Sequence, residues 1–147
     1  MTDKLEYVNS FSDLLVYRKA RELSLRIFSL TKQFPNEENY SLTDQIRRSS
    51  RSIGAQIAEA WAKRQYEKHF LSKLTDSDGE QQETQHWIAT ALDCGYISQE
   101  EAKLLFEKCA QIGRLLGGMM AKSKQFCKPF PYKIREEQAE YFIDSAI

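Results

Sequence analysis

The chain has 147 residues, of which 41% are hydrophobic and 29% are charged, and this balance is typical of one globular domain rather than a disordered chain. Its 21 basic residues equal its 21 acidic residues, so the overall charge does not indicate a strongly basic nucleic-acid-binding domain, although a local basic patch is compatible with it. Six glycines and three prolines argue against a fold of many short strands and favour long helices.

The first predicted helix spans about residues 13–33, with Ser12 as its N-cap and Pro35 beyond its end. Its inward positions follow a regular spacing of four and three residues: Val16, Ala20, Leu23, Ile27, Leu30 and Phe34. A second apolar set lies well around the same helix, at Leu14, Tyr17, Leu25 and Phe28. A helix that faces one core does not need two apolar stripes. Either the core face is wide, or the second set packs against another subunit. We therefore predict these four residues as the oligomer interface.

Three further helices are predicted at about residues 42–63, 66–94 and 99–125. The second begins at Ser41 and Asp44, a weak capping-box variant, whereas Ser98 and Glu101 form a good capping box for the fourth. Gly95 is expected just past the end of the third helix. The middle of that third helix is acidic, which predicts either a solvated face or carboxylates that meet arginines across the bundle: Asp76, Asp78, Glu80 and Glu83.

Short links between amphipathic helices favour antiparallel neighbours, so residues 1–127 are expected to form an all-α, up-down-up-down antiparallel four-helix bundle. Residues 128–147 form a separate tail in which Pro129 and Pro131 stop the helix. The tail could add a short helix whose aromatic residues dock on the bundle or on a neighbour. The three widely spaced cysteines and the lack of a signal-like or membrane-spanning stretch predict a cytoplasmic protein with no membrane partner.

Several segments of the chain resemble bacterial four-helix bundle proteins encoded in intervening sequences of 23S ribosomal RNA genes. The resemblance covers about residues 11–127 and is carried by these stretches: 13–20 (DLLVYRKA), 30–35 (LTKQFP), 42–50 (LTDQIRRSS), 52–60 (SIGAQIAEA), 70–74 (FLSKL), 83–88 (ETQHWI) and 93–97 (DCGYI). The resemblance implies a ring-like homo-oligomer, a pentamer where such proteins are characterised. It also implies, for some relatives, a role as accessory factors that bind a reverse transcriptase and nucleic acid. For most members it implies no established activity.

A basic cluster on the second helix is the best candidate for function: Arg47, Arg48 and Arg51. Arginine pairs with phosphate through two hydrogen bonds, which suits RNA or DNA. The competing interpretation is structural, with the arginines paired to carboxylates of the third helix or of a neighbour. A second basic group near the next turn is either an extension of the nucleic-acid site or a solvated surface: Lys63, Arg64, Lys68 and Lys73.

Enzymatic sites find little support in the sequence. A di-iron bundle needs two Glu-x-x-His motifs, and the chain has only Glu83-x-x-His86, because Tyr66 occupies the matching position before His69. No nucleophile, phosphate-binding loop or metalloprotease motif is recognisable. We therefore expect no catalytic residue, metal or cofactor. The leading hypothesis is a non-enzymatic homo-oligomeric scaffold that binds RNA or DNA, and the alternative is an adaptor that binds a protein partner encoded nearby.

Overall fold

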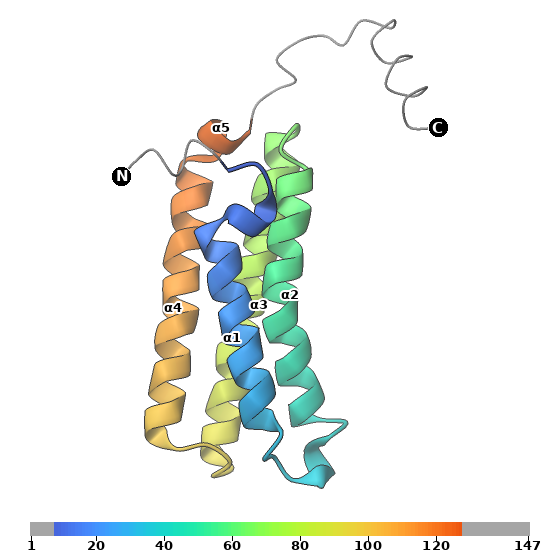
Figure 1. The fold of residues 1–147 in the computed structure, drawn as a ribbon, viewed down its shortest axis with the longest axis vertical. Helices are drawn as coiled ribbons and strands as arrows, with labels where there is room; N and C mark the ends of the chain where they lie inside the picture. The colour runs from blue at the N-terminus through green and yellow to red at the C-terminus, as the bar shows by residue number, and fades with distance from the viewer. Residues whose placement is uncertain (1–7, 128–147) are drawn as a thin grey trace, which may run out of the picture.

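The computed structural model describes residues 8–127, and every regular element in this part of the chain is helical. Four long helices follow one another along the chain, each antiparallel to the one before it (Figure 1): α1 (Leu15–Thr31), α2 (Leu42–Ala62), α3 (Glu67–Asp93) and α4 (Gln99–Ala121). Three short helices accompany them: η2 (Phe11–Asp13) before α1, η3 (Asn36–Glu38) between α1 and α2, and α5 (Ser123–Phe126) after α4. The prediction of an all-α fold is confirmed, whereas the predicted docking helix of the tail lies outside the described residues.

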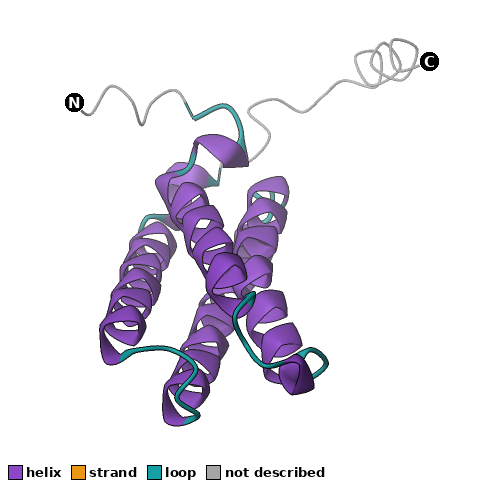
Figure 2. Ribbon diagram, turned by 60° about the horizontal axis from the view of Figure 1, so that its bottom comes forward, coloured by secondary structure: helices purple, strands orange, loops and turns teal. Residues whose placement is uncertain are grey.

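The long helices are arranged as a four-sided bundle. Each contacts two others, in the cyclic order α1, α2, α3, α4 and back to α1. Figure 2 shows this arrangement from the end that carries η3 and the α3–α4 turn. The contact between α1 and α4 is the slightest of the four, and that between α2 and α3 is the most extensive.

The predicted seam of α1 faces the core. Val16, Ala20, Leu23, Ile27 and Phe34 are buried, and Leu30 is half-buried against them. Apolar residues of α2 and α4 meet this seam at the same four-and-three spacing, because that spacing keeps one stripe of a helix facing its neighbours: Leu42, Ile46, Ile53, Ile57 and Ala60 on α2, and Ala102, Leu105, Cys109, Ile112 and Leu116 on α4.

The core has a polar layer at its middle, supplied mainly by α3. The buried positions of α3 follow the same spacing at Phe70, Leu74, Ser77, Gln81, Thr84, Ile88 and Ala91, so the central three are polar. The Ser77 hydroxyl donates a 2.9 Å hydrogen bond to the carbonyl of Ile53. The hydroxyls of Thr84 and Ser49 are hydrogen-bonded to each other at 2.9 Å. These bonds satisfy groups that would be costly to bury unpaired.

The helix ends confirm two sequence predictions and shift two others. Ser98 and Glu101 form the predicted capping box, with reciprocal bonds of 3.1 and 2.9 Å. Gly95 has φ +77° and ends α3 in a Schellman motif, in which the N–H of Tyr96 bonds to the carbonyl of Ala91. Helix α1 begins at Leu15 rather than 13, because Ser10 caps the separate turn η2. Helix α4 ends at Ala121 rather than 125, and α5 follows it.

Candidate functional site

The side chain of Phe28 on α1 is surrounded by three cations. The guanidinium carbons of Arg47 and Arg51, both on α2, lie 4.7 and 5.5 Å from the centre of its ring. The ammonium nitrogen of Lys32 lies 4.8 Å from the same point. Each distance is within the range of an attractive cation–π contact. The structure therefore brings together a residue predicted for the oligomer interface and two residues predicted for nucleic-acid binding.

Arg47 is held in place by a second contact with α1. Its Nε donates a 2.8 Å hydrogen bond to the hydroxyl of Thr31. That hydroxyl is buried and donates in turn to the carbonyl of Ile27 at 2.8 Å. Among residues 8–127, no hydrogen bond engages the two terminal amino groups of Arg47. They are the groups that pair with a phosphate, so the site is partly preorganised for one.

Of the structural interpretation of the arginines, the pairing with carboxylates of the third helix is absent within residues 8–127, while pairing with a neighbouring subunit stays a prediction. No ion pair in that range includes Arg47 or Arg51, and Arg48 pairs with Asp44 of its own helix at 3.8 Å while remaining 76% exposed. The acidic residues of α3 have other partners: Asp76 pairs with Lys73 at 3.8 Å, and Asp78 accepts a 2.9 Å bond from Gln81. Arg47 and Arg51 face α1 instead, where both contact the ring of Phe28.

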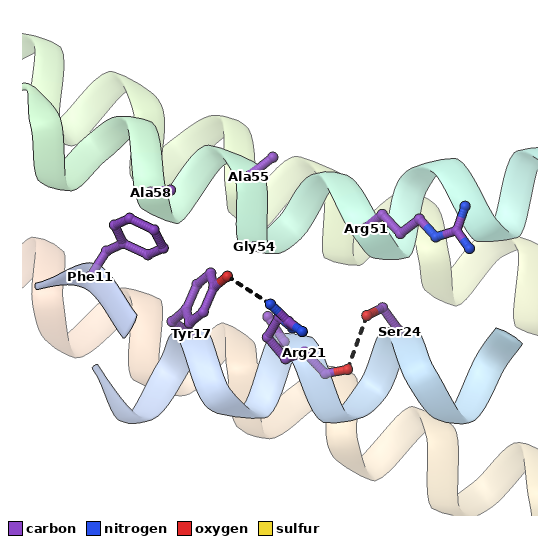
Figure 3. Close-up of a pocket in the computed structure, with 9 residues that line it drawn as sticks. Phe11, Tyr17, Arg21, Ser24, Arg51, Gly54, Ala55 and Ala58 are labelled. Carbon is purple, nitrogen blue, oxygen red and sulfur yellow. Dashed lines mark hydrogen bonds between the residues drawn. The ribbon is translucent and has the colours of Figure 1, made fainter. Parts of the chain in front are cut away.

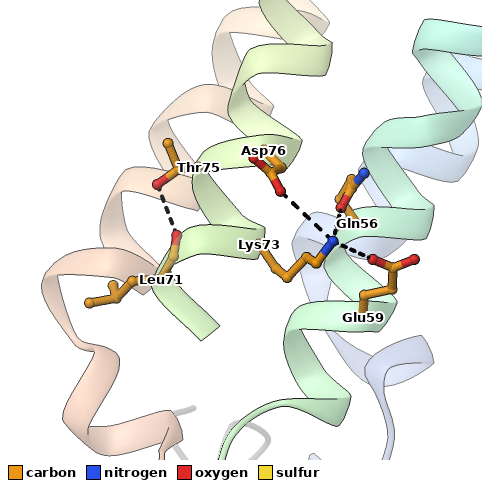
Figure 4. A network of polar contacts seen from close by, with 6 residues as sticks. All are labelled: Gln56, Glu59, Leu71, Lys73, Thr75 and Asp76. Carbon is orange, nitrogen blue, oxygen red and sulfur yellow. Dashed lines mark hydrogen bonds and ion pairs between the residues drawn. The ribbon is translucent and has the colours of Figure 1, made fainter. Parts of the chain in front are cut away.

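Lys73 provides the charged link between α2 and α3, as Figure 4 shows. Its ammonium lies 2.9 Å from a Glu59 carboxylate oxygen and 3.4 Å from the amide oxygen of Gln56. The pKa of Glu59 is lowered mainly by the hydrogen bond from Lys73 and next by the positive charge of Lys73. The same hydrogen bond raises the pKa of Lys73. This lysine of the second basic group is therefore engaged within the chain.

The rest of the second basic group lies near the C-terminal end of α2, far from Arg47 and Arg51. Arg64 folds back on Trp61, with its guanidinium carbon 3.5 Å from the ring centre and its Nε donating to the Trp61 carbonyl at 2.8 Å. Burial lowers the pKa of Arg64. Lys63 is 16 positions from Arg47, which is roughly 24 Å along a helix. Together with Lys68 at the start of α3, these residues form a separate surface and do not extend the site at Phe28.

A hollow between α1 and α2 adjoins Arg51. It has a volume of about 280 Å³, and Figure 3 shows the residues that line it: Phe11, Tyr17, Ala20, Arg21, Ser24, Arg51, Gly54, Ala55 and Ala58. The Tyr17 ring packs edge-on against Phe11 at 4.9 Å. Arg21 donates a 3.2 Å hydrogen bond to the Tyr17 hydroxyl. We call the hollow the α1–α2 groove, and we call the surface that joins it to Phe28 the basic strip, which comprises Arg21, Lys32, Arg47 and Arg51 with the rings of Tyr17 and Phe28.

The four residues predicted for the oligomer interface have different environments. Leu14 is only 6% exposed and belongs to the chain's own core, so its assignment to an interface is corrected. Tyr17 and Phe28 are half-buried on the α2 side of α1. Leu25 is 59% exposed. The second apolar stripe is therefore largely used within one chain, and only Leu25 leaves a large apolar surface open.

The residues considered for metal binding or catalysis have other contacts. Glu83 accepts a 3.3 Å hydrogen bond from the indole of Trp87, whose ring packs against His86. Within residues 8–127, no three His, Cys, Asp or Glu side chains gather as metal ligands would. Cys109 is fully buried, and burial raises the pKa of its thiol to about 12. No helix in the described part of the chain combines the length and apolar character that crossing a membrane requires.

Comparisons with known proteins place these features in context. Residues 12–118 match the family model described as 23S rRNA-intervening sequence protein. A crystal structure from Bacteroides thetaiotaomicron is also similar, of a protein with unknown function from the S23 ribosomal protein family. The two chains are 31% identical with a TM-score of 0.66, and the match covers 73% of this chain and 96% of the other. No curated protein sequence matches the chain.

Proposed function

The chain belongs to the family of 23S rRNA-intervening sequence proteins, and we propose that this member is a non-enzymatic, homo-oligomeric, cytoplasmic scaffold whose basic strip binds the backbone of RNA or DNA. The observation that carries this proposal is the convergence of Lys32, Arg47 and Arg51 on the ring of Phe28. Three cations at one place, none of them paired with a carboxylate within residues 8–127, form a phosphate-binding surface in a chain whose net charge is zero.

The aromatic rings beside the cations favour nucleic acid over an acidic protein as the partner. Aromatic rings interleave with the cations along the strip, and proteins that bind nucleic acid strands combine these two features. An acidic protein surface would engage the arginines equally well but would make less use of Tyr17 and Phe28. The alternative is a protein partner encoded nearby, such as a reverse transcriptase, and the test below distinguishes it from nucleic acid.

Self-association would strengthen binding through one strip. Leu15 and Leu25 are exposed on α1 at 49% and 59%, and they supply apolar surface for a second copy. A homo-oligomer would present one strip per subunit, so several weak phosphate contacts would add up to useful avidity. The resemblance to ring-forming relatives makes a pentamer the first assembly to test.

The test is binding of fluorescently labelled RNA and DNA, single- and double-stranded, over a series of salt concentrations. The variant replaces Arg47 and Arg51 by alanine, and the matched control replaces the exposed Arg114 of α4, which lies outside the strip. We expect the double variant to lose affinity and to lower the magnitude of the salt slope by about 1.4, since each phosphate contact on a single strand contributes about 0.7. Arg114→Ala should retain both affinity and slope.

Two results would contradict the proposal. One is the absence of binding by the wild-type protein at low salt, where electrostatic affinity is greatest. The other is a loss of affinity per removed charge in Arg114→Ala equal to that in the double variant, which would show that only the overall charge matters. If the Arg47/Arg51 variant instead loses a specific co-purifying protein and binds nucleic acid normally, the adaptor alternative is correct.

A further inference from the structure

The α1–α2 groove is lined by small residues of both helices, by two aromatic rings and by two arginines. On α2 its wall contains Arg51 and three residues without a side chain beyond Cβ: Gly54, Ala55 and Ala58. On α1 the wall contains Ala20, Ser24 and the hydrogen-bonded pair of Tyr17 and Arg21. A Cβ at Gly54 would lie 3.6 Å from the Tyr17 ring, so α1 packs closely there, and larger side chains at Ala55 and Ala58 would occupy the hollow.

The size of the groove limits what can enter it. Pockets for drug-sized ligands usually have volumes of roughly 300–1,000 Å³. At about 280 Å³ the groove lies just below that range and suits one planar ring system rather than an extended molecule. The rings of Phe11 and Tyr17 line it, and aromatic side chains are the ones that nucleobases contact in single-strand-binding proteins.

The charges around the groove indicate what the ring system is attached to. Arg51 lies at the end of the groove near Ser24, as Figure 3 shows, and its guanidinium is also 5.5 Å from the Phe28 ring. Arg47 lies one helical turn further, about 6 Å along α2. A chain that places a ring in the groove would therefore pass phosphate groups along Arg51 and Arg47. An uncharged or cationic ligand would leave this row of cations without a role.

From these features we propose that the groove receives an unstacked nucleobase, and hence that the basic strip recognises single-stranded rather than double-stranded nucleic acid. This inference rests on the proposed function and adds the class of strand. Bases in a duplex are stacked and paired, and extracting one costs a few kcal/mol, so a groove between two surface helices receives bases from a single strand in preference.

The test compares a labelled 20-nucleotide single strand with an abasic strand of the same length, which retains the phosphates but carries no bases. The wild-type protein should bind the strand with bases at least about five-fold more tightly, as expected for one stacked base. Ala58→Phe should fill the groove and remove that advantage while leaving affinity for the abasic strand unchanged. Ala55→Phe tests the same wall at a more exposed position, should Ala58→Phe fail to fold.

A matched control is Ala110→Phe, which places the same side chain in a different surface hollow, between α3 and α4, and should change neither affinity. Equal binding of the two strands by the wild type would refute the nucleobase pocket and leave the proposed function standing. No binding of either strand would refute both. If the groove variants alter the mass measured by light scattering but not the affinity for the strand with bases, the groove holds a side chain of another subunit and the inference is wrong.

Discussion

The hydroxyl of Tyr96 donates a 2.9 Å hydrogen bond to the carboxylate of Glu38, 58 residues earlier in the chain. The other carboxylate oxygen of Glu38 accepts from the Ser41 hydroxyl at 2.6 Å and from the N–H of Leu42 at 3.4 Å. Glu38 thus caps the start of α2, where the sequence had suggested Ser41, and it connects that start to the turn between α3 and α4. These bonds hold the pKa of Glu38 below its usual range and raise the pKa of Tyr96 to about 12.

The first prediction concerns the pH dependence of this contact. Because the pKa of Glu38 is lowered on folding, its contribution to stability is present above its unfolded value of about 4.3 and is lost as the pH falls below it. Because the pKa of Tyr96 is raised, its contribution is complete below about pH 10 and is lost as the pH rises toward 12. Tyr96→Phe should be less stable than wild type at pH 7.

Urea unfolding at several pH values measures this difference directly. The difference in unfolding free energy between wild type and Tyr96→Phe should shrink in acid and again above pH 10. A difference that is constant with pH would show that the Tyr96 hydroxyl does not interact with an ionised Glu38.

The second prediction separates the core from the surface of α1. Leu14→Ala should lower the free energy of unfolding by about 2–5 kcal/mol, because Leu14 is 6% exposed and its removal leaves a cavity. Leu25→Ala should cost less than about 0.5 kcal/mol of subunit stability. If α1 also contacts a second copy, the more disruptive Leu25→Asp should lower the mass measured by light scattering. An unchanged mass in an oligomeric protein would place the interface elsewhere.

The third prediction is a double-mutant cycle in the polar layer. Thr84→Val removes one partner of a buried hydroxyl pair and should cost about 1–3 kcal/mol, since the hydroxyl of Ser49 then loses a partner. Adding Ser49→Ala removes the second polar group, so the double variant should recover much of that loss. Chemical denaturation of the four proteins gives the coupling energy, and strictly additive costs would argue against a bond between the two hydroxyls.

The fourth prediction compares two glycines of α4. A Cβ at Gly117 would meet no atom within 4 Å, so Gly117→Ala should stabilise the protein by about 0.5–1 kcal/mol through helix propensity. At Gly113 a Cβ would lie 3.1 Å from the amide nitrogen of Gln81. Gly113→Ala should therefore gain less than Gly117→Ala or destabilise, because the Gln81 amide must shift. Thermal denaturation measures the change in stability of each variant. Equal stabilisation by both substitutions would show that the Gln81 side chain moves aside at no cost.

Much of the fold could be predicted because local rules and the tertiary structure agree. The capping box at Ser98 and the turn at Gly95 depend on side chains and conformations within a few residues, and both are confirmed. The seam of α1 also follows from spacing alone. The inward face of α3 was harder to recognise, because Ser77, Gln81 and Thr84 are polar. Their spacing places them on the buried stripe of the helix, but their polarity suggests exposure.

The candidate site was predicted only in part. Arg47 and Arg51 were identified as the basic cluster, but their contact with Phe28 depends on how α1 and α2 lie against each other, which no single helix reveals. Leu14 was assigned to an interface because the sequence does not show that the chain bends there before α1 begins, which turns its side chain inward. The small residues at Gly54, Ala55 and Ala58 are the only signal in the sequence of α2 that indicates the groove.

The hydroxyl pair between α2 and α3 has a consequence for how the chain avoids misfolding. Helices with uniformly apolar stripes can slide past one another by two turns and still bury their surfaces. If α3 slid toward the start of α2, Thr84 would face Leu42 in place of Ser49 and would lose its side-chain partner. A few modest hydrogen bonds thus select one register of α3 against α2 among several that apolar packing alone would allow.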